Sequence, residues 1–190
     1  MAESLIHAAI AVTEREQLLI RHGVVYPGGV TPLLPDKLGA IIAATTVFER
    51  VGVAYALIGG LAVGVRSGVP RATLDVDFAI PSTVDRHALT LQFCQVGFVL
   101  RGEFAHSINF SHASGEPVQL AFDPSFDAIV ARAEVMHFGE LSLRVVTKAD
   151  LLTMKRQAAA DPKRRRSKAL RDQADIALLE GDIPADDEGW

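Results

Sequence analysis

The sequence predicts an α/β (α+β) domain with a mixed sheet, N-terminal helices and a C-terminal helical segment. Between Ala54 and Val146, short apolar runs typical of strands alternate with segments of helical spacing. Outside this region, apolar residues recur at helical spacing only. We therefore expect an N-terminal helix and Pro/Gly loop in residues 1–34, a core in 35–146, and C-terminal helices with an acidic tail in 147–190.

The first part of the chain is typical of two helices joined by a loop. A helix is expected at Glu3–Arg21, and Tyr26–Pro35 contains three prolines and two glycines, which favour a loop. A second helix is expected from Asp36 to Arg50, and Gly52 ends it.

The core begins with a strand, a Gly-Gly turn and a short helix at Leu61–Arg66. Ser82, with Asp85 three residues later, indicates a capped helix start. The expected strands of the core are Ala54–Ile58, Leu74–Ile80, Gly97–Arg101, Ser107–Ser111, Pro117–Phe122 and Leu141–Val146.

Two helices are expected after the core. Thr147 and Asp150 repeat the capping pattern at the start of a helix that ends near Ala160. The last helix is expected at Arg166–Glu180, with Gly181 after it. The apolar residues that this helix is expected to bury are Leu170, Ala174, Ala177 and Leu178.

The composition excludes several classes of protein. With 190 residues, of which 49% are hydrophobic, the chain is long and apolar enough for one globular domain. The single cysteine, Cys94, excludes a disulfide framework and a Cys-rich zinc site. No apolar run reaches the ~20 residues of a membrane span, and the N-terminus lacks the pattern of a signal peptide. We expect a cytoplasmic protein with no membrane partner.

A run of basic residues interrupts an otherwise acidic chain. Six of the nineteen Lys and Arg residues lie between Lys163 and Arg171, without one acid, although the net charge is -4. Such a run is typical of a patch that contacts phosphates or RNA, and equally of a solvated helix face. Both interpretations stay open at this stage.

An Asp-x-Asp pair lies inside an apolar strand. Because side chains alternate along a strand, Asp75 and Asp77 share one face, roughly 6.6 Å apart. Two neighbouring carboxylates on a partly buried surface repel each other and lose hydration. A divalent cation offsets both costs, and Mg²⁺ prefers oxygen ligands and keeps waters that a phosphate can replace. We predict that this pair holds Mg²⁺ (or Mn²⁺).

The Gly-Gly turn supplies a complementary feature. A helix that starts at about Leu61 presents free N–H groups and the positive end of its dipole, where phosphate binds. Gly59 and Gly60 let the backbone approach a phosphate without a Cβ in the way. A phosphate cradle beside metal-holding carboxylates is what nucleotidyl transfer requires. An ordinary tight turn is the structural alternative.

These motifs make the chain similar to the nucleotidyltransferase superfamily of the polymerase-beta type. The likeness covers roughly residues 54–179 and is nearest to the AbiEii-like and MenT-like toxin branch. It lies in residues 56–65 (ALIGGLAVGV), 71–78 (RATLDVDF), 146–155 (VTKADLLTMK) and 171–176 (RDQADI).

The resemblance implies roles for further residues. Asp75 and Asp77 would be catalytic metal ligands. The nucleotide would be bound by Gly59, Gly60, Arg71, Thr73 and Lys155. A surface charge is the alternative role for Arg71, and a solvated lysine the alternative for Lys155. The i,i+4 pairs of the last helix, such as Arg171 with Asp175, favour helix stabilisation over substrate contact.

One position departs from the family pattern. Relatives place a third acid on a later strand, where this chain has Gln119. A neutral amide cannot be a general base and is a poor Mg²⁺ ligand. Three outcomes stay open: Asp123, four residues on, substitutes as a catalytic acid, the site works on two carboxylates, or activity is lost.

The resemblance implies an enzyme that moves NMP from an NTP, such as ATP, to a hydroxyl of RNA (for example tRNA) or of protein. The family branch adds a toxin role with an antitoxin partner. The alternative is a nucleotide- or RNA-binding protein on the same scaffold, in which Gln119 has weakened or removed catalysis. A third interpretation, hydrolysis of phosphate esters, would use the same carboxylates with water as acceptor.

Overall fold

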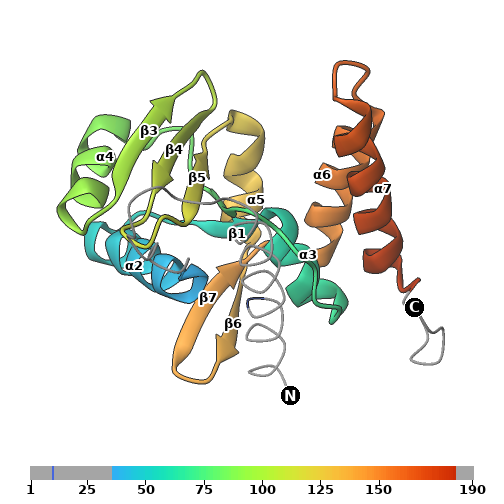
Figure 1. Ribbon diagram of the computed structural model, residues 1–190, viewed down its shortest axis with the longest axis horizontal. Helices are drawn as coiled ribbons and strands as arrows, with labels where there is room; N and C mark the ends of the chain where they lie inside the picture. Colours follow the sequence, from blue (N-terminus) through green and yellow to red (C-terminus); the bar gives the residue numbers. More distant parts are fainter. Residues whose placement is uncertain (1–9, 11–35, 183–190) are drawn as a thin grey trace, which may run out of the picture.

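The computed structural model describes Ile10 and residues 36–182, which form a sheet and the helices around it (Figure 1). The sheet has seven strands in the order β3-β4-β5-β2-β1-β7-β6. They are β1 (Ala56–Ile58), β2 (Val76–Ala79), β3 (Val99–Glu103), β4 (Ser107–Ser111), β5 (Pro117–Ala121), β6 (Glu134–Phe138) and β7 (Leu141–Val145). β1 is parallel to β7 and β2 to β5, and the other neighbours are antiparallel. The expected α/β class with a mixed sheet is confirmed.

The helices cover the sheet and extend beyond it. α2 packs against α4 and β2, whereas α3 lies between the sheet and a hairpin of α6 and α7 that stands to one side (Figure 1). The helices are α2 (Lys37–Val51), α3 (Gly59–Ser67), α4 (Arg86–Gln95), α5 (Asp127–Arg132), α6 (Lys148–Ala160) and α7 (Arg166–Glu180), with a 3₁₀ turn, η1 (Pro124–Phe126), before α5. Among the described residues, no helix is long and apolar enough to cross a membrane.

Aromatic packing fixes the side of the sheet that α2 and α4 cover. Phe48 of α2 contacts Phe78 of β2 at 5.4 Å between ring centroids, and Phe93 of α4 at the same distance. All three rings are fully buried. The alternation along β2 therefore turns Phe78 toward this core and Asp77 toward the opposite face.

Several expected boundaries are confirmed. Asp36 caps α2 by accepting a hydrogen bond from the Gly39 amide, and Gly52 ends the helix in the left-handed conformation. Thr147 caps α6 by accepting from the Asp150 amide. The bounds of α7 agree with the expectation, and the expected strands are present within about two residues at each end. Residues 1–9, 11–35 and 183–190 lie outside the described residues, so the N-terminal helix, the Pro/Gly loop and the acidic tail stay predictions.

One local prediction was wrong, and two elements were not predicted. Ser82 does not cap α4, because its amide and hydroxyl both donate to the Asp127 carboxylate, at 2.7 and 2.8 Å. The cap is Asp85, which accepts from the Ala88 amide. β6 and α5 were not predicted, because their residues show no clear periodicity.

The buried face of α7 is not the one expected. Leu170 is 55% exposed, whereas Asp172, Asp175 and Leu179 are buried. Two acids therefore occupy inward positions at helical spacing, a pattern that apolar periodicity cannot detect. Their partners come from other elements and belong to the site described next.

Candidate active site

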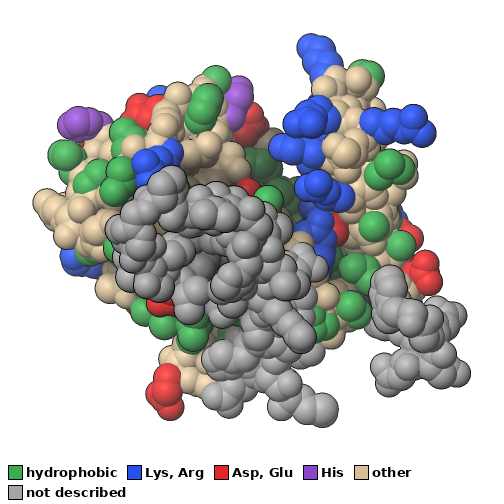
Figure 2. Space-filling view, in the orientation of Figure 1, with side chains coloured by type: hydrophobic (Ala, Val, Ile, Leu, Met, Phe, Trp, Pro, Cys, Tyr) green, Lys and Arg blue, Asp and Glu red, His purple; other side chains and the backbone are tan. Residues whose placement is uncertain are grey.

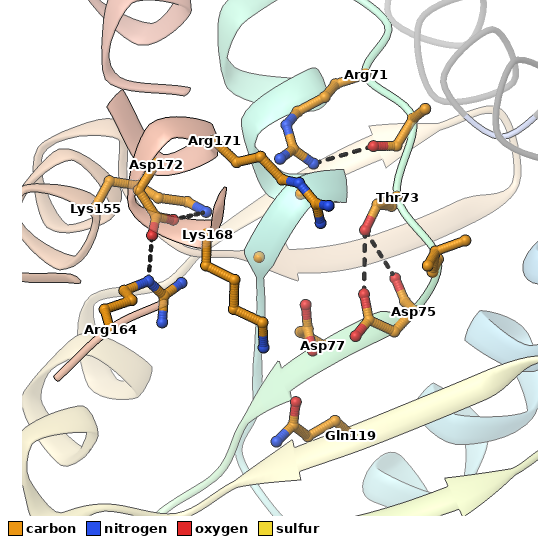
Figure 3. Close-up of a pocket in the computed structure, with 14 residues that line it drawn as sticks. Arg71, Thr73, Asp75, Asp77, Gln119, Lys155, Arg164, Lys168, Arg171 and Asp172 are labelled. Atoms are coloured by element: carbon orange, nitrogen blue, oxygen red, sulfur yellow. Dashed lines mark hydrogen bonds and ion pairs between the residues drawn. The ribbon is translucent and has the colours of Figure 1, made fainter. Parts of the chain in front are cut away.

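A cavity of about 750 Å³ opens between the sheet and the α6–α7 hairpin. Figure 2 shows the recess, with Lys and Arg side chains of the hairpin along one wall. From the sheet side it is lined by Gly59, Gly60, residues 71–75, Asp77 and Gln119, and from the hairpin by Lys155, Arg164, Lys168, Arg171 and Asp172. Most of the predicted site residues therefore line one cavity (Figure 3).

The two predicted metal ligands lie together on the cavity floor. Asp75 precedes β2 and its carboxylate accepts a hydrogen bond from the Thr73 hydroxyl at 3.2 Å, whereas Asp77 lies within β2 (Figure 3). Burial, and then the neighbouring charge of Asp75, raise the pKa of Asp77 to about 7. Lys155, Lys37 and Lys168 act in the opposite direction. Two carboxylates have thus been brought together at an electrostatic cost.

The residues present fit a Mg²⁺ or Mn²⁺ ion. Among the described residues, neither Asp75 nor Asp77 takes part in an ion pair, so no side-chain cation satisfies them directly. Hard carboxylate oxygens are the ligands that both ions prefer. Within residues 36–182 no group of three or more His, Cys, Asp and Glu side chains could hold a metal. An ion bound here would therefore have two carboxylate ligands from the described residues.

The two glycines make room for the site's own side chains. Gly59 has φ +72°, and a Cβ built on it would overlap the Asp77 carboxylate. A Cβ on Gly60 would overlap the Arg71 guanidinium and the Thr73 side chain, at 2.8 Å from the Thr73 Cβ. The glycines therefore allow the first turn of α3 to lie directly against the acid-bearing strand, which the sequence analysis had not foreseen. Whether they also contact phosphate stays a prediction.

We expect Gly59→Ala to lower thermal stability and abolish metal binding, because the new methyl group displaces Asp77 and the residue keeps a positive φ. Gly68→Ala is the matched control: Gly68 ends α3 with φ +78° and has open space around the position of a Cβ. It should cost about 1 kcal/mol and leave metal binding intact. Thermal unfolding with and without Mn²⁺ measures both effects. Equal losses in the two variants would contradict the close-contact explanation.

Lys155 is engaged in the joint between the hairpin and the core. Its Nζ lies 3.0 Å from the Asp172 carboxylate and 2.7 Å from that of Asp175. Arg71 forms an ion pair with Asp175, and Arg164 with Asp172. Because both acids are buried, these pairs fix α7 to α6 and to the loop before β2. The expected i,i+4 pair of Arg171 with Asp175 is not formed, because Asp175 pairs with Arg71 and Lys155.

Two cations of α7 that line the cavity, Lys168 and Arg171, could contact a ligand. Among the described residues, neither takes part in an ion pair, and Figure 3 shows both side chains extending into the cavity, with Lys168 toward Asp77. From the sequence, these residues were expected in the basic run and in i,i+4 pairs of the last helix, and neither was expected to bind nucleotide. Their spacing of three places both on one helix face, which is the signal that could have identified them.

Comparisons with known proteins bear on the fold. The crystal structure of the lincosamide antibiotic adenylyltransferase LnuA, lincomycin-bound, matches with a TM-score of 0.56 and 14% identity over 76% of this chain and 97% of that chain. ANT(2")-Ia in complex with adenylyl-2"-tobramycin gives 0.54 and 16% over 77% and 90%. An antigenic nucleotidyltransferase-like protein from Paracoccidioides brasiliensis gives 0.53 and 23% over 83% and 82%. The chain has a nucleotidyltransferase fold. No family model and no curated protein matches the sequence.

The nucleotidyltransferase fold confirms the expected scaffold and leaves the finer assignment open. None of the three structures just described is that of a protein named as a toxin. The AbiEii-like and MenT-like branch therefore stays a prediction.

Asp123 lies apart from the other predicted site residues. It is not among the residues that line the cavity. Its carboxylate accepts from the Ser125 amide at 2.9 Å, and its other oxygen lies 3.1 Å from His106 Nδ1. Hydrogen bonds from Ser125, and then the charge of His106, hold the pKa of Asp123 below its usual range. Its place as the N-cap of η1 explains this position, and the expected substitution of Asp123 for the third acid stays a prediction.

Gln119 lies where the sequence resemblance predicts a third acid. β2 and β5 are parallel, and Asp77 lies opposite Gln119 in their register. Gln119 lines the cavity, and Figure 3 shows its amide below Asp77. The amide is therefore part of the site, as the sequence position indicated.

Proposed function

We propose that this protein is a Mg²⁺-dependent (or Mn²⁺-dependent) nucleotidyltransferase that moves NMP from an NTP to a hydroxyl group of RNA. One observation carries the proposal: Asp75 and Asp77 share a cavity with the N-terminus of α3 and with two cations of α7, Lys168 and Arg171. These are the parts needed to hold a metal and a triphosphate side by side. The nucleotidyltransferase fold supports the proposal but does not by itself assign an activity.

The triphosphate has two complementary contacts in the cavity. α3 begins at Gly59, and its N-cap residue, Ile58, makes no side-chain hydrogen bond to the first amides of the helix. These amides, at the positive end of the helix dipole, favour an anion. Lys168 and Arg171 face them from the hairpin. The phosphates would therefore lie between α3 and α7, over the two carboxylates.

The chemistry follows from this placement. The acceptor hydroxyl attacks the α-phosphorus in line, the bond to the β-phosphate oxygen breaks, and pyrophosphate leaves. A Mg²⁺ ion held by Asp75 and Asp77 would polarise the α-phosphate. Lys168 and Arg171 stabilise the negative charge that grows on the departing pyrophosphate. Arg71 and Lys155 act indirectly, since their ion pairs hold α7 at the correct distance.

The charge of the hairpin favours RNA as the acceptor. Arg164, Lys168 and Arg171 form one wall of the cavity, and the basic run continues to the exposed turn between α6 and α7 at Lys163 and Arg165. This wall attracts a polyanion and repels a cationic acceptor. The identity of the base and a role as toxin, with an antitoxin partner, are finer parts of the proposal.

The direct test is to incubate the protein with each α-labelled NTP, Mg²⁺ and total RNA, and to separate RNA, protein and free nucleotide. ATP is the first candidate because LnuA is an adenylyltransferase and ANT(2")-Ia was solved in complex with adenylyl-2"-tobramycin. Label in RNA supports the proposal. Label only in protein identifies a protein acceptor, and free NMP alone indicates hydrolysis. For the toxin role, growth arrest on expression would have to disappear in the Asp75→Asn variant.

Substitution of Lys168 and Arg171 tests the binding of the triphosphate. Lys168→Ala combined with Arg171→Ala should raise the KM for NTP about 10- to 100-fold, since two charge-assisted contacts to phosphate are lost. Lys163→Ala with Arg165→Ala removes the same charge from exposed residues that do not line the cavity. Initial rates against NTP concentration measure both. Equal KM values in the two double variants would contradict the assignment.

A binding protein without turnover is the second candidate, and Gln119 is the observation that favours it. In that case, nucleotide binds with Mg²⁺ but label is never transferred. Nucleotide binding measured by calorimetry beside the transfer assay separates the two. Any transfer by the wild-type protein that is lost in Asp77→Asn excludes the second candidate.

A further inference from the structure

The residues that lie beside Asp77 in the register of the neighbouring strands carry amide side chains. Across three neighbouring strands the row is Asp77 on β2, Gln119 on β5 and Asn109 on β4. The neighbouring positions, where a third acid would extend the site, therefore carry two neutral amides. Adjacent strands lie about 4.8 Å apart, so Gln119 is within reach of any ion held by Asp77.

Three other acids of the described residues have partners elsewhere in the structure. Asp123 caps η1 and pairs with His106, and Asp127 accepts two hydrogen bonds from Ser82. Asp172 is bound by Lys155 and Arg164 of the hairpin. Two divalent ions about 3.5–4 Å apart need bridging and terminal carboxylates to offset their mutual repulsion. Asp75 and Asp77 supply only two.

We propose that Gln119 makes this a one-metal centre, an inference that rests on the proposed function. Asp75 and Asp77 hold a single divalent ion, and no carboxylate of the described residues removes the proton from the acceptor hydroxyl. The hydroxyl oxygen bonds to the α-phosphorus, the α–β bridging bond breaks and pyrophosphate leaves with the electron pair. The hydroxyl proton passes to water. Gln119 contributes a neutral amide that can hydrogen-bond the acceptor without attracting a second cation.

The test counts metal ions, independently of turnover. Electron paramagnetic resonance of Mn²⁺ is recorded on the protein with an NTP analogue that carries a methylene bridge between the α- and β-phosphorus atoms. The wild type should hold one Mn²⁺ per chain, with the signal of an isolated ion. Gln119→Asp should hold two, and their proximity should give a spin-coupled spectrum. Gln119→Asn, the matched neutral control, should resemble the wild type.

The outcomes separate this inference from the proposed function. A spin-coupled pair in the wild type overturns the one-metal centre and leaves nucleotidyl transfer standing. A single ion in Gln119→Asp, in a protein whose thermal unfolding shows that it is folded, also overturns it, because Gln119 would not occupy a ligand position. Gln119→Glu provides a second carboxylate variant should Gln119→Asp fail to fold. If the wild type binds no Mn²⁺ apart from the ion that the free analogue itself carries, the proposed function is overturned.

Discussion

Replacing either carboxylate of the pair should abolish transfer: Asp75→Asn and Asp77→Asn should each lower the rate about 10³-fold. A metal in this chemistry stabilises several kcal/mol of developing charge, and about 4 kcal/mol corresponds to that factor. Both side chains face the cavity, and no cation of the described residues pairs with them, so the amides remove the charge that holds the ion. Label transferred from NTP to RNA at saturating Mg²⁺ measures the loss.

The control for this prediction is an acid that the sequence singled out and the structure separates from the site. Asp123→Asn should leave the rate within about twofold, because its carboxylate serves η1 and His106 outside the cavity. A large loss in Asp123→Asn with full activity in Asp77→Asn would contradict the assignment of the pair. It would restore Asp123 as the catalytic acid.

The acid pair and the glycine turn could be predicted because their relationship is local. Gly59, Gly60, Asp75 and Asp77 belong to consecutive elements, β1, α3 and β2, and β1 pairs directly with β2. Alternation along a strand then determines which face carries the acids. The structure places the glycines against Asp77 and Arg71, a contact that sequence spacing alone could not show.

The roles of the cations could not be predicted, because they depend on which acids the cations meet. Lys155 and Lys168 are both helical lysines in the sequence. Only the packing of α6 on α7 neutralises Lys155 with Asp172 and Asp175 and leaves Lys168 available. Apolar periodicity failed on α7 for the same reason, since its buried positions hold paired acids. Long-range ion pairs leave no periodic signal in a single sequence.

Asp77→Asn should stabilise the metal-free protein at pH 8 and have little effect near pH 4. Burial and the charge of Asp75 raise the pKa of Asp77 to about 7, against about 3.9 in an unfolded chain. The folded state therefore holds a proton that the unfolded state has lost between these values, and stability falls as pH rises toward 7. Above pH 7 the full cost of ionising Asp77 is present. The amide avoids a cost of about 2–4 kcal/mol.

Urea unfolding of both proteins in the presence of chelator, at pH 4, 6 and 8, measures the difference in the free energy of unfolding. We expect this difference to grow with rising pH and to level off above pH 7, because the amide of the Asp77→Asn variant has no charge to desolvate. Millimolar Mn²⁺ at pH 8 should then remove the difference by stabilising only the wild type. This reversal distinguishes an ion site from a merely strained carboxylate. A variant less stable than the wild type at pH 8 without metal would mean that Asp77 is satisfied by the protein itself, which is incompatible with a metal-binding pair.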